Sequence, residues 1–127
     1  MNLPHIIFIR PDKHNPKYKE VMFYINEDKY LIELDKKGNI TKQSKEFELD
    51  DCDKKLFKNI SKLNLEVLYD EDDNYQKAYI LNLRTMFYAP ISFRQVIFYL
   101  NNPNCLPRIL NSCYSKHGIR KINDRKG

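Results

Sequence analysis

Cysteine and histidine are the side chains of this sequence that could carry out nucleophilic catalysis, and one pair has a helical spacing. Cys113 and His117 are four residues apart, so on a helix they would share a face and the imidazole could activate the thiol. Cys113 also falls on an apolar stripe, and the sequence identifies neither an oxyanion donor nor a carboxylate to orient the histidine. We therefore interpret Cys113 as a core residue. A small hydrolase or nuclease using His117 with Cys113 or Cys105 stays as an alternative.

Glycine-dependent and zinc-dependent motifs are missing from the sequence. Its three glycines are too few for a phosphate-binding loop or a dinucleotide fingerprint, and no Gly-x-Ser-x-Gly elbow occurs. His5, His14 and His117 are scattered and lack the spacing of zinc ligands. We therefore expect a protein that is not an enzyme and that holds no metal and no cofactor.

An acidic turn at residues 70–74 superficially resembles a calcium-binding loop. Asp70, Asp72 and Asn74 alternate as calcium ligands do. Tyr75, however, stands where that loop needs glycine, and Leu81 stands where it needs a bidentate glutamate. We interpret the segment as a solvated turn that keeps sheet edges from aggregating.

The formal net charge of the chain is concentrated in its C-terminal segment. Residues 1–103 hold 16 basic and 16 acidic side chains, whereas residues 104–127 hold six basic side chains and one acidic one. The first part is therefore neutral and the second carries the whole net charge of +5. Such asymmetry favours an anionic partner. The candidate phosphate-contacting residues are Arg108, Lys116, Arg120, Lys121, Arg125 and Lys126.

Nucleic acid is the partner that these cations suit best. Lysine or arginine placed against phosphates releases counterions, and arginine can hold a phosphate with two parallel hydrogen bonds. Sixteen tyrosine and phenylalanine rings could stack on bases, but no stretch matches the RNP pattern, so we expect most of them in the core. Our leading hypothesis is a small RNA-associated factor, ribosome-bound or part of another ribonucleoprotein. The alternative is a protein-interaction module or a viral or host-adaptation effector.

Length and composition predict one domain over residues 1–118 followed by a basic tail over residues 119–127. The chain has 127 residues, of which 42% are hydrophobic and 31% charged, as in a globular protein. No apolar run approaches the about 20 residues that span a bilayer, and no secretory signal is evident, so we expect an intracellular, cytoplasmic protein with no membrane partner. We predict that Cys52, Cys105 and Cys113 are reduced thiols in the core.

The first half of the sequence shows mainly the patterns of β-strands. Residues 3–9 predict a strand that is buried on both faces. Residues 21–25 and 30–34 predict a hairpin with a four-residue turn, and a second turn at residues 35–39, with Gly38 at positive φ, leads to a weak strand at 40–43. Residues 50–64 then predict a helix with Asp51 or Asp53 as N-cap and with Leu56, Phe57, Ile60 and Leu63 on its apolar face.

The second half predicts a second hairpin and two helices. Residues 65–69 and 75–83 are the expected strands of the hairpin. Ser92 and Gln95 form the pattern of a capping box, with Ile91 and Val96 as its hydrophobic staple. A further helix is expected around residues 106–114. We therefore predict an α+β fold with an antiparallel sheet of two hairpins or a meander, and about three helices packed on one face.

Overall fold

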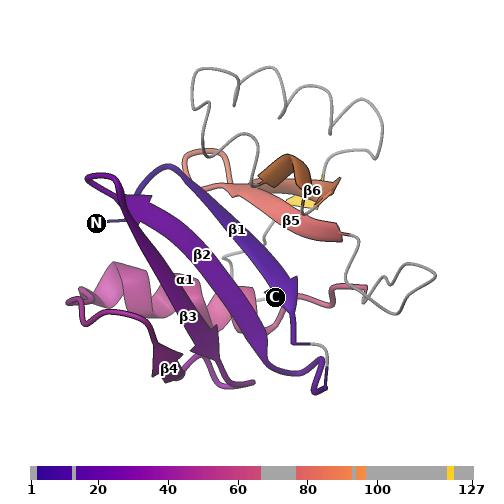
Figure 1. Cartoon of the computed structure of the whole chain (residues 1–127). Coiled ribbons are helices and arrows are strands. Elements are labelled where there is room, and N and C mark those ends of the chain that lie inside the picture. The colour runs from indigo at the N-terminus through magenta and orange to yellow at the C-terminus, as the bar shows by residue number, and fades with distance from the viewer. Residues whose placement is uncertain (1–2, 13, 67–76, 93, 97–119, 122–127) are drawn as a thin grey trace.

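Antiparallel strand pairing dominates this chain (Figure 1). The computed structural model describes residues 3–12, 14–66, 77–92, 94–96 and 120–121. Over these ranges the elements are β1 (Ile6–Pro11), β2 (Lys19–Ile25), β3 (Asp28–Leu34), β4 (Ile40–Gln43), α1 (Asp51–Ser61), β5 (Lys77–Asn82), β6 (Phe87–Ser92) and β7 (Arg120–Lys121). The strands form one sheet in the order β4-β3-β2-β1-β5-β6-β7. The prediction of an α+β fold with an antiparallel sheet is therefore confirmed.

Strand β1 lies at the centre of the sheet, between β2 and β5. Ile9 is opposite Val21 of β2 and Tyr79 of β5, and all three belong to the main core. Because side chains alternate along a strand, Phe8 lies on the opposite face, where it is also buried. The prediction that this strand is buried on both faces is confirmed.

The β2–β3 hairpin has a tighter turn than predicted. Ile25 pairs with Asp28, so the loop consists of Asn26 and Glu27 alone and not of four residues. Both residues have positive φ, at 50° and 72°, as in a type I′ turn. That turn type matches the right-handed twist of the flanking strands. This explains why β2 and β3 remain paired up to a loop of two residues.

The turn between β3 and β4 follows the prediction. Gly38 has a φ of +88°, and the side chain of Asp35 accepts hydrogen bonds from the backbone N–H groups of Lys37 and Asn39, each at 2.9 Å. A Cβ atom at Gly38 would lie 2.7 Å from Cα of Lys58 in α1. Glycine is therefore required here both for its backbone conformation and for the close approach of the turn to the helix.

Helix α1 covers one face of the sheet, and its N-cap is neither of the two predicted residues, Asp51 and Asp53. Asp50 is the N-cap: its Oδ1 accepts a hydrogen bond from the Asp53 N–H at 2.8 Å, and Oδ2 of Asp53 accepts one from the Asp50 N–H at 3.4 Å. This reciprocal pair needs a spacing of three, which Asp50 and Asp53 provide. Three residues of the predicted apolar stripe, Leu56, Phe57 and Ile60, are buried in the main core. The fourth, Leu63, lies beyond the end of the helix at Ser61 and is half-buried against this core.

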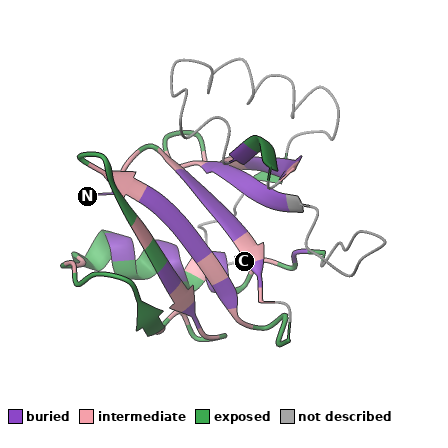
Figure 2. Cartoon of the chain, viewed as in Figure 1, coloured by how far each residue is buried: buried purple, intermediate pink, exposed green. Residues whose placement is uncertain are grey.

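Burial on α1 also corrects the prediction for its cysteine (Figure 2). Cys52 is exposed, although the sequence predicts a core thiol. The buried stripe of α1 runs through Asp53 and Phe57, so that Cys52, in the first turn, lies at the margin of this stripe. Cys105 and Cys113 lie outside the described residues.

The second half of the chain contributes more sheet and less helix than predicted. The predicted strand at residues 65–69 is not formed at Leu65 and Glu66, and its other residues lie outside the described part. β5 instead pairs with β1 and with β6, a strand that was not predicted because it contains Pro90. Pro90 lacks an N–H group and so signals a break, yet β7 pairs only with Phe87 and Tyr88, so Pro90 lies beyond the described pairing on that side of β6.

The prediction of about three helices does not match the part of the structure that is described, which is mostly sheet. It contains α1 and a short helical segment at residues 94–96. Oε1 of Gln95 accepts a hydrogen bond from the Ser92 N–H at 3.3 Å, which is one half of the predicted capping box, and both staple residues, Ile91 and Val96, are buried. The helix predicted around residues 106–114 lies outside the described residues. Within the described ranges, no helix has the length and apolar character needed to cross a membrane.

Candidate nucleic-acid interface

Two of the six predicted phosphate-contacting residues lie in the described part of the chain, and both belong to a strand. Arg120 and Lys121 form β7, where Arg120 is opposite Tyr88 and Lys121 is opposite Phe87. Both side chains are exposed at the edge of the sheet. Two residues of the segment predicted as a tail are therefore paired with the sheet. The other four, Arg108, Lys116, Arg125 and Lys126, lie outside the described residues.

Aromatic side chains of β6 lie directly beside these two cations. Nζ of Lys121 is 5.9 Å from the centroid of the Phe87 ring, within the range of a cation–π interaction. Phe87 is half-buried. The edge formed by β6 and β7 thus combines positive charge with an aromatic side chain, two features found in surfaces that bind single-stranded nucleic acids.

Tyr79 of β5 serves the core and not the surface. Its ring is buried and packs edge-on against Tyr88, with the ring centroids 6.3 Å apart. Its hydroxyl accepts a hydrogen bond from the Glu66 N–H at 3.1 Å and donates one to the Glu66 carbonyl at 3.3 Å. Burial raises the pKa of the Tyr79 hydroxyl above its ordinary value. Tyr79 therefore cannot stack on a base, in agreement with the expectation that most rings pack in the core.

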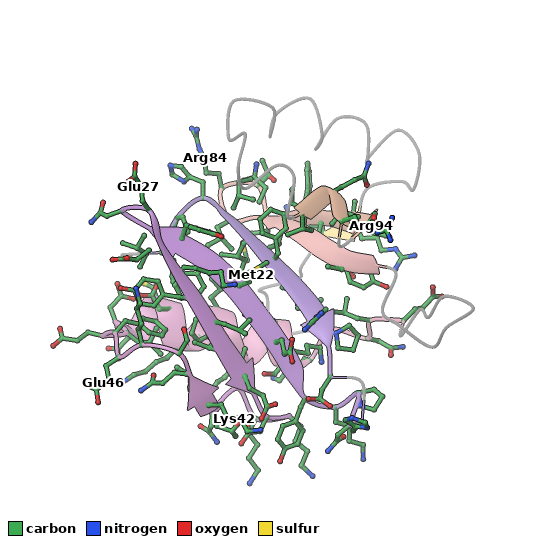
Figure 3. The ribbon with its side chains drawn as sticks, in the orientation of Figure 1. Met22, Glu27, Lys42, Glu46, Arg84 and Arg94 are labelled. Carbon is green, nitrogen blue, oxygen red and sulfur yellow. The ribbon has the colours of Figure 1, made fainter. Side chains whose placement is uncertain are left out.

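Further cations flank the β5–β6 hairpin (Figure 3). Arg84 lies in the turn between the two strands and Arg94 follows the other end of β6, and both are exposed. The sequence contains a signal for this surface that the net-charge count overlooked. Residues 74–123 include no aspartate or glutamate but seven lysines and arginines. The strands β5, β6 and β7 themselves therefore contain no acidic side chain, and Glu66, whose backbone contacts Tyr79, is an acid that lies beside β5.

The face of the sheet opposite α1 carries a hollow with a different character. The hollow has a volume of about 200 Å³, and its apolar lining comes from Phe8, Met22, Leu31 and Ala78. Charged side chains at its rim are mixed in sign: Nε of Arg10 lies 2.6 Å from Oε2 of Glu20. Arg10 and Glu20 are paired, and Lys29 is the third charged residue of the lining, so apolar and charged groups of both signs occur together. A mixed apolar and charged surface suits a protein partner better.

Leu31 makes this hollow accessible from outside. Its exposed fraction of 37% is the largest among the large hydrophobic side chains of the described residues. A second hollow of about 340 Å³ adjoins the first and shares Leu31 and Glu20 with it. The surface over β2 and β3 is therefore a candidate contact region that the sequence analysis did not identify, because strand alternation alone cannot show which face a helix leaves uncovered.

The described structure does not test the alternative catalytic pairing of His117 with Cys113 or Cys105. Cys105, Cys113 and His117 lie outside the described residues, and His5 and His14 are exposed on separate segments. Over the ranges that the structure describes, no three His, Cys, Asp or Glu side chains are grouped as metal ligands would be. The acidic turn at residues 70–74 also lies outside these ranges.

Comparison of the chain with protein-family models, with curated proteins and with solved structures finds no match.

Proposed function

We propose that the protein is a small, non-enzymatic RNA-associated factor, ribosome-bound or part of another ribonucleoprotein, that contacts phosphates through β7. The observation that carries the proposal is the exposure of Arg120 and Lys121 beside Phe87, in a half of the sheet whose strands contain no acidic side chain. Positive potential that is not cancelled locally attracts a polyanion from a distance and holds it on contact.

The position of the two cations at a sheet edge supports contact with a nucleic-acid backbone. Among the described strands, β7 lies at one edge of the sheet, and an edge strand has a row of backbone groups and side chains that a nucleic-acid backbone can contact. The remaining predicted contacts, Arg108, Lys116, Arg125 and Lys126, would extend the same positive surface. We place the protein inside the cell, in the cytoplasm, where RNA is available and the exposed thiol of Cys52 stays reduced.

The test is the double substitution Arg120→Ala with Lys121→Ala, measured by binding to a single-stranded RNA over a range of salt concentrations. Each lost phosphate contact lowers the slope of log affinity against log salt by about 0.7, so the slope should fall by about 1.4. Affinity at 0.1 M salt should fall about 25-fold for the same reason. Because β7 is paired through backbone groups, substitutions test the side chains better than truncation after Gly118, which would remove the strand.

The control is a double substitution at the other end of the sheet, Lys29→Ala with Lys42→Ala. Both lysines are exposed, and the control changes the net charge by the same amount. The proposal predicts that this variant binds RNA nearly as well as the wild type. Equal affinity and equal salt slope for the Arg120/Lys121 variant and the wild type would sink the proposal.

A protein-interaction module is the second candidate, and the hollow around Leu31 is the observation that favours it. The two candidates are distinguished by affinity purification from cells before and after complete RNA digestion. An RNA-associated factor loses its co-purifying proteins on digestion, whereas a direct protein partner is retained.

A further inference from the structure

A second basic surface lies on the solvent side of α1. Lys54, Lys58 and Lys62 are separated by four residues each, so they lie one above the other on the helix, and Lys55 is beside them. All four side chains are exposed, whereas Leu56 and the rest of the apolar stripe point into the core. The helix therefore presents a continuous row of lysines away from the sheet.

The turn between β3 and β4 brings two more lysines to this row. Gly38 lies so close to α1 that an added Cβ would meet the backbone of Lys58. Lys36 and Lys37, both exposed, precede Gly38 in the same turn. The carboxylate of Asp35 is occupied by hydrogen bonds to the backbone of this turn. The lysine surface, as we call it, consists of Lys36, Lys37, Lys54, Lys55, Lys58 and Lys62.

The charges of the lysine surface are offset only in part by a neighbouring acid, Asp35: a hydrogen bond from the Asn39 backbone and the charge of Lys37 both lower the pKa of the Asp35 carboxyl group. Among the described residues, none of its six ammonium groups forms an ion pair with an aspartate or glutamate. Like charges four residues apart on a helix repel each other, so this arrangement weakens α1 and does not stabilise it. A polyanion lying along the helix would remove the repulsion.

We propose that the lysine surface is a second phosphate-binding surface for RNA, separate from β7; this rests on the proposed function. Lysine ammonium groups are point charges without the planar fork of arginine, so the contact would be to the backbone and independent of base sequence. RNA is favoured over an anionic membrane because the apolar side chains of α1 are buried against the sheet, which leaves none to insert between lipids.

The two surfaces lie at opposite ends of the sheet. The lysine surface adjoins the β3–β4 turn, and β7 is the far edge strand. Five strand spacings of about 4.8 Å, or about 24 Å, separate β7 from β3, where the turn with Lys36 and Lys37 begins. The end of α1 near Lys62 lies one strand closer, because the Ser61 carbonyl accepts a hydrogen bond from Lys19 of β2. One or two nucleotides cannot reach both surfaces, so the protein would hold either a longer single strand or two separate segments of RNA.

The experiment compares two triple variants by binding to a single-stranded RNA of about 30 nucleotides. The test variant is Lys54→Gln, Lys58→Gln and Lys62→Gln, and glutamine keeps the helix propensity of lysine. The control variant is Lys17→Gln, Lys29→Gln and Lys42→Gln, three exposed lysines elsewhere with the same total charge. We expect the test variant to bind the RNA about a hundredfold more weakly at 0.1 M salt. Its slope of log affinity against log salt should be smaller by about 2, and the control variant should have nearly the affinity and slope of the wild type.

Each alternative outcome has a distinct meaning. Equal weakening in both triple variants shows that net charge alone matters and overturns the inference. An unchanged test variant overturns it as well, while the Arg120/Lys121 variant still reports separately on the proposed function. Binding of the wild type to vesicles containing phosphatidylserine, lost in the test variant while RNA binding is unchanged, assigns the surface to a membrane and also overturns it.

Chemical footprinting of the wild type keeps the inference testable if the triple variant does not fold. Acetylation of lysine amines is measured by mass spectrometry with and without the RNA. The six lysines of the lysine surface should become protected, and Lys17, Lys29 and Lys42 should not. Unprotected amines on α1 in the RNA complex contradict the inference.

Discussion

At the scale of single residues, Gly38 is required for two reasons: the backbone conformation of its turn and the close contact of that turn with α1. Its φ of +88° is one that other residues adopt only at a cost, and its Cα lies against the backbone of Lys58. We expect Gly38→Ala to lower the free energy of unfolding by about 1–3 kcal/mol, measured by urea denaturation. The substitution strains the turn, and the new methyl group forces it away from α1.

A comparison with Gly38→Asn separates the two causes. Asparagine tolerates positive φ better than alanine, but it carries the same Cβ. If contact with α1 dominates, both variants lose similar stability. If the asparagine variant is much more stable than the alanine variant, backbone strain dominates. If neither variant is less stable than the wild type, the described contact with α1 is contradicted.

Lys19 is a residue whose burial makes stability depend on pH. Its side chain is 3% exposed, and its Nζ donates a hydrogen bond to the Ser61 carbonyl, at the end of α1, at 2.8 Å. Burial lowers the pKa of the Lys19 ammonium group below its ordinary value of 10.5. In the window between the lowered folded pKa and 10.5 the unfolded chain binds more protons, so the Lys19 contribution to stability rises as pH rises through that window.

The test of Lys19 is the substitution Lys19→Met. At neutral pH the variant should be less stable by about 1–3 kcal/mol, because the buried Ser61 carbonyl loses its donor. The difference in free energy of unfolding between the wild type and the variant should widen as pH rises toward 10.5. Only the wild type loses a buried positive charge, because Lys19 is deprotonated. If the free energies of unfolding of the two proteins change in parallel over the alkaline range, the pKa of Lys19 is not lowered in the folded protein.

At the scale of elements, the β2–β3 hairpin depends on a turn that its residue types do not favour. Asn26 suits positive φ, but Glu27 adopts a φ of 72° without the freedom of glycine. We expect Glu27→Gly, which creates an Asn-Gly type I′ turn, to raise the free energy of unfolding by about 0.5–1 kcal/mol in thermal or urea denaturation. The control Glu27→Ala keeps the strain and should give no such gain, and a destabilised glycine variant would contradict the turn assignment.

At the scale of the whole molecule, positive charge is gathered at two separate places on one sheet. One place is the half of the sheet with β7, whose strands contain no acidic side chain, and the other is the lysine surface on α1. Compensated charges such as the Arg10–Glu20 pair lie between them, on the opposite face from α1. The two RNA-binding predictions therefore belong to different ends of the molecule, and their variants should act independently because the sites share no side chains.

Charge counting along the chain could find part of the candidate site, and geometry was needed for the rest. The sequence shows that Arg120 and Lys121 are cations of a basic segment, but their place in a strand depends on pairing with β6. Strand β6 could not be predicted because Pro90 is unusual within a strand. In the sequence, nothing distinguishes the lysines of α1 from an ordinary solvated helix face. Their proximity to Lys36 and Lys37 depends on the close packing of Gly38 against Lys58 of α1, which no pattern of neighbouring residues predicts.

The sequence by itself determined the features that arise from neighbouring residues. The burial of β1, the apolar stripe of α1 and the positive φ of Gly38 follow from side-chain periodicity and backbone sterics, which act over a few residues. Only the tertiary structure decided that β5 pairs with β1, that Lys19 caps the end of α1 and that two segments form the lysine surface. These features join residues far apart in the chain, and their energies come from packing that exists only when the whole sheet has formed.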